Sequence, residues 1–393
     1  MVCAFIQECK KPDWLLFGAV LFLSFLGILN LQSLALSNAE FKTLLIKQVL
    51  FVGLGFGVAL GISTFDYRVL RTRSALIFLL WLCAVAVLVL PIVFGIRVRG
   101  AASWISFLGV SLQPIEFIKI VLLIVLAKYF AGRTQELVRP RHLIASGFYV
   151  AVPSLIAILQ PDLGAAVLFA AVWFAVVALL GLPVRRIATL FLLFGVIAGA
   201  FWIGGLEPYQ RERIASFFSP EPHALGAGYQ VKQALIAIGS GGLWGRGTQG
   251  ALHARLGMLP ESATDFSFAA LVEQIGFLGG ASILVAFAII IFRILRIGFV
   301  ATNNFSRAYA VGLATLLFAE MTINIGMNVG FLPVTGLPLP FVSYGGSHTI
   351  ATLLGIGLLE SIRRHQPQML ISRGIFEHSA EDFSEALPMH VAV

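Results

Sequence analysis

The sequence predicts an all-α polytopic membrane protein with about ten transmembrane helices, on the basis of its composition and the lengths of its apolar runs. Of its 393 residues, 59% are hydrophobic and 12% charged, whereas about a quarter of the residues in a soluble domain are charged. A bilayer core of about 30 Å requires about 20 helical residues. Apolar runs near that length lie at residues 14–31, 44–62, 75–96, 115–130, 143–159, 163–182, 187–206, 266–292, 308–332 and 347–362.

Segment lengths indicate how three parts of the chain are organised. Residues 14–31 exceed the apolar part of a secretory signal, which has about 7 to 15 residues, so they are expected to remain as the first helix. Residues 143–159 and 163–182 are separated only by Gln160-Pro161-Asp162; a single helix there would be about twice the bilayer thickness, so we expect a hairpin. Residues 206–265 form one long outer loop, in which residues 229–238 predict a short amphipathic or re-entrant helix.

The chain is expected to form a single transmembrane domain over residues 1–365, followed by a disordered cytoplasmic tail at 366–393. The tail mixes charge, Ser, Pro and scattered apolar residues without a period, which is typical of disorder. Cys3 and Cys9 fall on the cytoplasmic side and Cys83 falls inside a helix, so no disulfide framework or metal cluster is expected.

The distribution of Lys and Arg predicts that both termini are cytoplasmic, because positively charged short loops stay on that side. With the N-terminus inside, seventeen Lys and Arg lie in the cytoplasmic segments, against four in the short outer loops and five in the long one. The formal charge of +8 is then explained by topology and by anionic lipid at the inner face. We expect no nucleic-acid partner.

Asp265 is the first candidate for chemistry. It closes the long polar loop, at the point where the chain re-enters the apolar run 266–292. A carboxylate there is half desolvated and needs a cation, a hydrogen-bond donor or a substrate. Glu273, two turns further along, is expected on nearly the same helix face and would extend the outer cavity inward.

Charged and polar residues also interrupt other apolar runs, where they are costly. Glu116 and Lys119 are spaced i and i+3, close enough to pair. They either form a buried ion pair that packs two helices together or line a water-filled cavity that rearranges around a diphosphate. Asp162 either caps a helix or contributes to a site. A stripe at steps of four, made of Glu320, Asn324 and Asn328, is typical of contacts between helices.

The segment between the last two runs, residues 332–347, has three prolines and three glycines and cannot be a regular helix. Irregular backbone at membrane depth needs protein or a water cavity around it, so this segment is expected to fold over the site. His253 and His348 are expected to be surface or structural residues. Small residues Gly279-Gly280-Ala281 and Gly312 suggest a surface for a single-pass partner.

Several segments together resemble the SEDS family, the RodA and FtsW type proteins of bacterial shape, elongation and division. The matching segments are Gly100 to Trp104, Gln113-Pro114 with Glu116 to Lys119, Gln160 to Gly164, Tyr209-Gln210-Arg211 with Arg213, Gly226 to Gln230, Ala237 to Gly242, Leu259-Pro260-Glu261, Thr264-Asp265-Phe266, Asn324 to Met327 and Ser343 to Ser347. The resemblance covers nearly all of residues 13–364.

The sequence departs from the family pattern at Ser103, Ile115 and Ser267. Phe65-Asp66-Tyr67-Arg68 favours RodA, whereas the length of the 247–259 segment is nearer FtsW.

The resemblance implies a peptidoglycan glycosyltransferase that polymerises lipid II at the outer face of the bacterial cytoplasmic membrane, beside a class B penicillin-binding protein as transpeptidase. Asp265 would be the catalytic base, or would hold a divalent cation, Mg²⁺ or Mn²⁺; no organic cofactor is expected. The expected substrate-binding and cavity residues are Trp104, Gln113, Glu116, Lys119, Asp162, Arg211, Arg213, Glu273, Ser343 and Tyr344. Two alternatives remain: a lipid II flippase and a non-catalytic scaffold for the transpeptidase.

Overall fold

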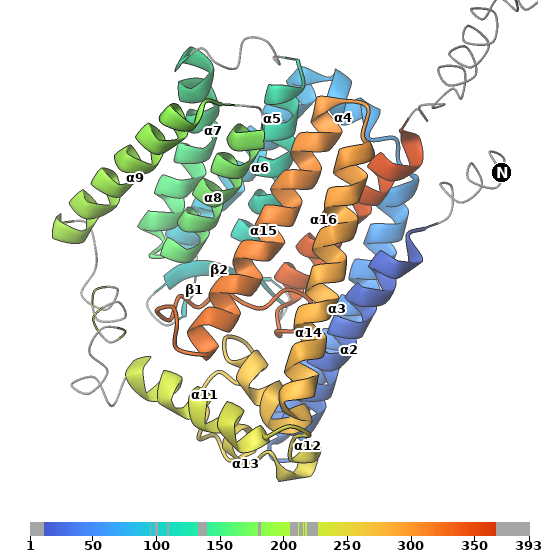
Figure 1. Ribbon diagram of the computed structural model, residues 1–393, viewed down its shortest axis with the longest axis vertical. Helices are drawn as coiled ribbons and strands as arrows, with labels where there is room; N and C mark the ends of the chain where they lie inside the picture. Colours follow the sequence, from blue (N-terminus) through green and yellow to red (C-terminus); the bar gives the residue numbers. More distant parts are fainter. Residues whose placement is uncertain are drawn as a thin grey trace, which may run out of the picture.

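Each apolar run predicted as a membrane segment coincides with a helix in the computed structural model. The structure describes residues 12–94, 96–98, 101–107, 110–132, 140–179, 182–204, 211, 215, 217 and 227–366. These helices are α2 (Trp14–Ala35), α3 (Ala39–Thr64), α5 (Ser74–Phe94), α6 (Pro114–Ala131), α7 (Pro140–Leu159), α8 (Leu163–Leu179), α9 (Val184–Gly204), α14 (Ser267–Val300), α15 (Asn304–Asn328) and α16 (Gly346–His365). Most of them run along the long axis of the molecule (Figure 1).

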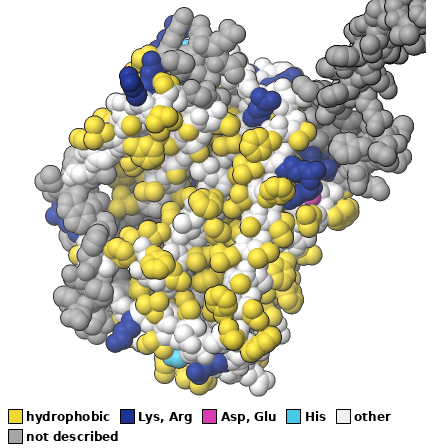
Figure 2. All heavy atoms as spheres, viewed as in Figure 1, with side chains coloured by type: hydrophobic (Ala, Val, Ile, Leu, Met, Phe, Trp, Pro, Cys, Tyr) yellow, Lys and Arg dark blue, Asp and Glu magenta, His cyan; other side chains and the backbone are white. Residues whose placement is uncertain are grey.

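Six helices of the described part, α2, α3, α5, α7, α14 and α15, are long and apolar enough to cross a membrane. Helices α6 and α16 have similar lengths but carry charged side chains within them. Figure 2 shows apolar side chains over the middle of one face and Lys and Arg mainly toward its ends. The expected multi-pass helical membrane protein is confirmed, while ten crossings stay a prediction. The tail after residue 366 lies outside the described residues.

Polar side chains at the helix ends explain where helices begin. Asp13 caps α2 by accepting from the Leu16 amide at 3.2 Å, and its carboxylate also accepts from Arg293 of α14 at 2.8 Å. Asn38 caps α3 by accepting from the Glu40 amide at 2.9 Å, so α3 begins five residues before the predicted apolar run. A short helix, α4 (Arg68–Thr72), joins α3 to α5.

A small antiparallel sheet between α5 and α6 departs from the all-helical prediction. It consists of β1 (Ile96–Val98), β2 (Ala101–Phe107) and β3 (Val110–Leu112), in the order β1-β2-β3. In register, Trp104 lies opposite Ile96, and Ile105 lies opposite Leu112. The Val, Ile, Trp and Phe residues of this stretch favour strands, but its short runs give too little period-2 signal to separate it from a loop.

The described part of the outer loop folds into α11 (Ala227–Gly241), α12 (Gly247–Gly250) and α13 (Leu252–Arg255) at one end of the bundle (Figure 1). Helix α11 confirms the predicted amphipathic helix and is longer than expected. At Gly276 the backbone of α14 has φ +73°, and a Cβ there would lie 2.3 Å from the Gly245 amide nitrogen. The kink in α14 therefore depends on two glycines in close contact.

Helix α15 packs against α6, α8, α14 and α16. Gly312 lies on its buried face, where a Cβ would approach the Leu123 side chain to 2.7 Å and also contact Val176 and Val172. Its small size serves packing inside the bundle. The expectation that Gly312 belongs to a surface for a partner helix is therefore wrong.

Helix α2 contacts the irregular segment 332–345 at Gly27, where an added Cβ would lie 2.2 Å from the Val342 carbonyl oxygen. We expect Gly27→Ala to lower the unfolding temperature, because overpacking of this kind costs about 1–3 kcal/mol. Gly18→Ala in the same helix is the control, since its Cβ would meet nothing within 4 Å. The measurement is the fraction of monodisperse protein after heating in detergent. Equal unfolding temperatures for the two variants would contradict the close contact.

Candidate active site

Asp265 lies in a tight turn at residues 259–266, which we call the site turn. The amides of Thr264 and Phe266 donate to the Glu261 carbonyl at 3.0 and 3.1 Å, and α14 begins only at Ser267. Asp265 is half-buried. It therefore precedes the helix and does not share a helix face with Glu273, contrary to the sequence prediction.

Two asparagines of α15 hold the main chain of Asp265. The side-chain amides of Asn324 and Asn328 each donate to the Asp265 carbonyl oxygen at 3.0 Å. The Asn328 side-chain oxygen also accepts from the Ala269 amide at 3.0 Å, which fixes the first turn of α14. The polar stripe thus joins helices, as predicted, and sets the position of the candidate catalytic residue.

The irregular segment 332–345 folds against the other side of the site turn. Ser343 donates through its hydroxyl to the Thr264 carbonyl at 2.6 Å, and its oxygen accepts from the Leu339 amide at 2.9 Å. The Tyr344 amide donates to the Ala263 carbonyl at 2.8 Å. Ser343 and Tyr344 are therefore both hydrogen-bonded to the turn that carries Asp265. Partial burial raises the pKa of the Tyr344 phenol above its ordinary value.

Strained backbone flanks Asp265 on both segments. Glu261 in the site turn has φ +57°, and Phe341 in the 332–345 segment has φ +66°. Non-glycine residues rarely adopt this left-handed conformation, and it is retained mainly where the surroundings impose it, often at functional sites. From α2, the Asn30 side-chain amide donates to the Ser262 carbonyl at 2.9 Å, so a third element fixes the turn.

A second group of polar side chains surrounds Lys119, and we call it the Lys119 cluster. The Lys119 ammonium donates to Glu116 Oε2 at 2.8 Å and to Glu320 Oε1 at 2.7 Å. His348 Nδ1 lies 2.7 Å from Glu116 Oε2. All four side chains are at most 4% exposed. Helices α6, α15 and α16 therefore meet at one buried ammonium.

The Lys119 cluster also contains the one group of three potential metal-ligating side chains found among the described residues, namely Glu116, Glu320 and His348. The Lys119 ammonium already bonds to both carboxylates of that group. The cluster is thus built for a lysine cation and does not fit a resident metal ion. In the part of the chain that the structure describes, Asp265 has no such group around it.

The remaining predicted site residues occupy different positions. Asp162 caps α8 by accepting from the Ala165 amide at 3.0 Å. The Gln113 amide donates to Ser347 Oγ at 3.0 Å and so joins α6 to α16. Trp104 lies partly exposed on β2, and Arg211 is exposed. Arg213 lies outside the described residues.

Glu273 has contacts of its own, away from the site turn. Its carboxylate is fully buried and accepts from the His253 amide at 3.1 Å and the Ala254 amide at 3.4 Å, and it lies 2.9 Å from His253 Nδ1. It therefore holds α13 against α14. A contact between Glu273 and substrate stays a prediction.

Sequence reasoning gave Glu320 and His348 no part in the site. Glu320 was seen only as a member of the α15 stripe, and His348 was expected to be a surface or structural residue. The structure buries His348 beside Glu116, which excludes a surface position. Lys119 lies in an apolar run with only one carboxylate, Glu116, in its own helix, and this indicated a further acidic partner. The sequence did not show that the partner is Glu320.

Helical spans of this kind, with irregular chain folded over a half-buried carboxylate, define a polytopic membrane protein with a candidate active site at one end. The chain matches the model of the FtsW/RodA/SpoVE family, described as "Cell cycle protein", over residues 13–368. It therefore belongs to that family, as the sequence motifs predicted.

The named relatives include enzymes. The chain is 33% identical to stage V sporulation protein E of Bacillus subtilis, over 90% of this chain and 98% of that protein. It is 37% identical to peptidoglycan glycosyltransferase MrdB of Escherichia coli, over 74% of this chain and 78% of that protein. Relatives named FtsW match at similar identity, so the preference for RodA stays a prediction.

Solved structures confirm the fold. The chain superposes on rod shape determining protein RodA of Thermus thermophilus with a TM-score of 0.68 and 29% identity, over 91% of this chain and 98% of that one. A chain of a peptidoglycan synthase complex superposes with a TM-score of 0.78 and 30% identity, over 91% of this chain and 99% of that one.

We expect Lys119→Met to cost about 3–5 kcal/mol of stability, because it leaves two buried carboxylates without their cation. Glu320→Gln is the matched variant: it keeps the Glu116–Lys119 pair and an oxygen that accepts from the ammonium, so its cost should be smaller. Unfolding temperatures of both variants in detergent give the comparison. If Glu320→Gln were as unstable as Lys119→Met, charge compensation would not be what holds the cluster.

Proposed function

We propose that this protein is a peptidoglycan glycosyltransferase that polymerises lipid II at the outer face of the cytoplasmic membrane, with both termini in the cytoplasm. The observation that carries the proposal is the half-buried Asp265, whose main chain is fixed by Asn324 and Asn328. Relatives named peptidoglycan glycosyltransferase support the reaction class. The excess of Lys and Arg in the segments assigned to the inside supports the orientation.

Asp265 is assigned as the general base. In the reaction, the 4-hydroxyl of the acceptor GlcNAc attacks the anomeric carbon of the donor MurNAc. The hydroxyl proton passes to the Asp265 carboxylate, the new glycosidic bond forms, and the bond to undecaprenyl diphosphate breaks. A base must lie within hydrogen-bonding distance of the proton it takes, and the contacts of the site turn fix where this carboxylate can reach.

Positive charge must balance the diphosphate as it leaves. Arg211 and Arg213 of the outer loop are the proposed contacts, since Lys119 is already held by two carboxylates. Mg²⁺ or Mn²⁺ would add further charge, because such ions bind through one or two carboxylates together with substrate phosphates. In that alternative Asp265 holds the ion, which polarises the acceptor, and is not itself the base; the Lys119 cluster has no part in the contact.

The proposed partner is a class B penicillin-binding protein that crosslinks the new strand. A peptidoglycan synthase complex among the similar structures supports a partner of this kind. Within α14, Gly280 is buried against Val272 and Phe268 of the same helix. With Gly312 also internal, the stretch of small residues proposed as the partner surface is reduced to Gly279 and Ala281.

We expect Asp265→Ala to lower glycan polymerisation from purified lipid II by at least about 100-fold, the lower end of what a general base contributes. The assay uses the protein co-purified with its transpeptidase, with and without a divalent cation. Glu40→Gln, an exposed carboxylate at the start of α3, is the control and should retain activity. Polymer from Asp265→Ala at the wild-type rate would show that another residue is the base.

The flippase alternative is separated by a second measurement. Translocation of the lipid II head group is followed in liposomes that contain the purified protein without any polymerising partner. We expect none above protein-free liposomes. Head-group translocation together with no polymer from a folded wild-type complex would favour the transporter over the enzyme.

A further inference from the structure

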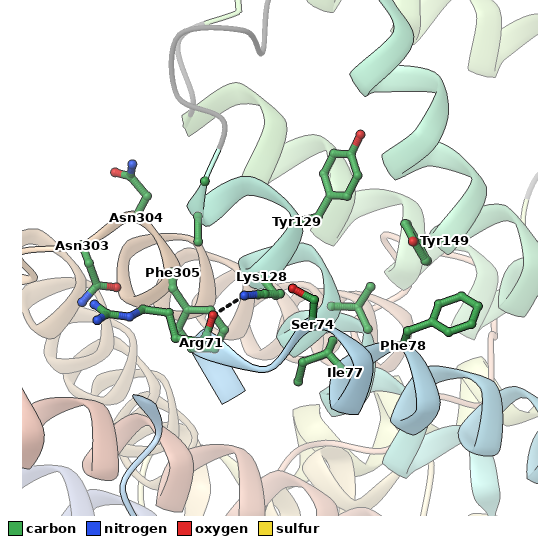
Figure 3. A pocket seen from close by; sticks show the side chains of 13 residues that line it. Arg71, Ser74, Ile77, Phe78, Lys128, Tyr129, Tyr149, Asn303, Asn304 and Phe305 are labelled. Atoms are coloured by element: carbon green, nitrogen blue, oxygen red, sulfur yellow. Dashed lines mark hydrogen bonds between the residues drawn. The ribbon is translucent and has the colours of Figure 1, made fainter. Parts of the chain in front are cut away.

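A hollow lies at the end of the bundle opposite the site turn, and we call it the Arg71 cavity. It has a volume of about 550 Å³. Its walls come from the α4–α5 junction, the C-terminal half of α6, from α7, and from the α14–α15 junction (Figure 3). The predicted topology places this end at the inner leaflet, and α14 separates it from Asp265.

The charge of the Arg71 cavity is positive. Arg71 and Lys128 line it, and its described lining contains no carboxylate. The Lys128 ammonium donates to the Arg71 carbonyl oxygen, which caps the end of α4 and fixes the lysine beside the cavity (Figure 3). A positively charged lining favours an anion as the occupant.

Arg71 is the group left to meet that anion. Its side chain is half-buried and extends toward Asn303 (Figure 3). No hydrogen bond or ion pair to the guanidinium is found among the residues that the structure describes. By contrast, Asn303 is committed elsewhere: it accepts from the Ser306 amide at 2.9 Å and donates to the Tyr67 hydroxyl at 3.0 Å. A partly desolvated arginine in a cavity is suited to a phosphate, which its planar fork binds through two hydrogen bonds.

The other wall of the cavity is apolar and continues onto the lipid-facing surface. Ile77, Val125 and Phe305 line the interior, and Phe78 is 53% exposed on the outer side of α5. Leu79 beside it is 56% exposed. A soluble anion gains nothing from such a wall, whereas an acyl chain does, at about 0.8 kcal/mol per buried methylene.

Aromatic side chains place the cavity at head-group depth. Tyr129 and Tyr149 line it with ring centroids 5.9 Å apart, and Tyr149 meets Trp81 edge to face at 5.3 Å. Tyr and Trp are enriched at membrane–water interfaces. Cationic pockets between transmembrane helices at the cytoplasmic side are known to bind anionic head groups.

We propose that the Arg71 cavity binds an anionic glycerophospholipid, with its phosphate on Arg71 and its acyl chains along Phe78 and the outer face of α5. This inference does not depend on the glycosyltransferase assignment, because none of its residues belongs to the site turn or the Lys119 cluster.

The test is native mass spectrometry of the full-length protein with phosphatidylglycerol and phosphatidylcholine of identical acyl chains. We expect the wild type to retain phosphatidylglycerol preferentially. Arg71→Gln should weaken that binding about fivefold, since one basic residue near the membrane surface contributes about 1 kcal/mol, and should leave phosphatidylcholine unchanged. Ser74→Phe should have the same effect by filling the cavity without a change of charge.

Arg73→Gln is the matched control, since this arginine follows α4, is exposed and does not line the cavity. An equal loss in Arg73→Gln would show diffuse attraction of anionic lipid and overturn the proposal. Displacement of phosphatidylglycerol by glycerol phosphate at equal concentration would show a phosphate site without a lipid. Preferential displacement by undecaprenyl diphosphate would make the cavity part of a substrate path. Unfolding temperatures in phosphatidylcholine verify that the variants fold.

Discussion

One buried ammonium constrains how the bundle can pack. Lys119 cannot remain in an apolar interior without compensation, and Glu116 of its own helix supplies one carboxylate while Glu320 of α15 supplies another. Because a buried charge without its partner is so costly, α6 and α15 are locked in one relative rotation. The same rotation directs Asn324 and Asn328 of α15 toward the site turn. The buried ion pairs of Lys119 therefore also determine where the half-buried Asp265 is held.

Much of the fold could be predicted because membrane segments are long and their composition is extreme. All ten apolar runs coincide with helices, and the hairpin at Gln160-Pro161-Asp162 follows from length alone. The sheet at 96–112 escaped prediction, because two of its three strands have only three residues and leave almost no periodic signal. Helix ends shifted where caps such as Asn38 extended a helix beyond its apolar run.

The sequence predicted which kinds of residue form the candidate site better than it predicted how they are arranged. Polar residues in apolar runs identified Glu116, Lys119 and the α15 stripe, since each needs a reason to be in the membrane. What joins them is tertiary: His348 is 232 positions from Glu116, and Asn324 is 59 positions from Asp265. No local pattern encodes such pairings. Spacing alone also put Asp265 and Glu273 on one helix, whereas the helix starts after Asp265 and Glu273 faces α13.

The buried carboxylate of Glu273 also sets an order of assembly. His253 and Ala254, whose amides donate to it, are made about 20 residues earlier. Until Glu273 has been made, these amides lack the carboxylate that they bond to in the folded protein, so α13 is not yet held against α14. The contact between α13 and α14 can therefore form only after the part of α14 that carries Glu273 has been made, and the contacts from Asn324, Asn328 and Ser343 to the site turn form later still.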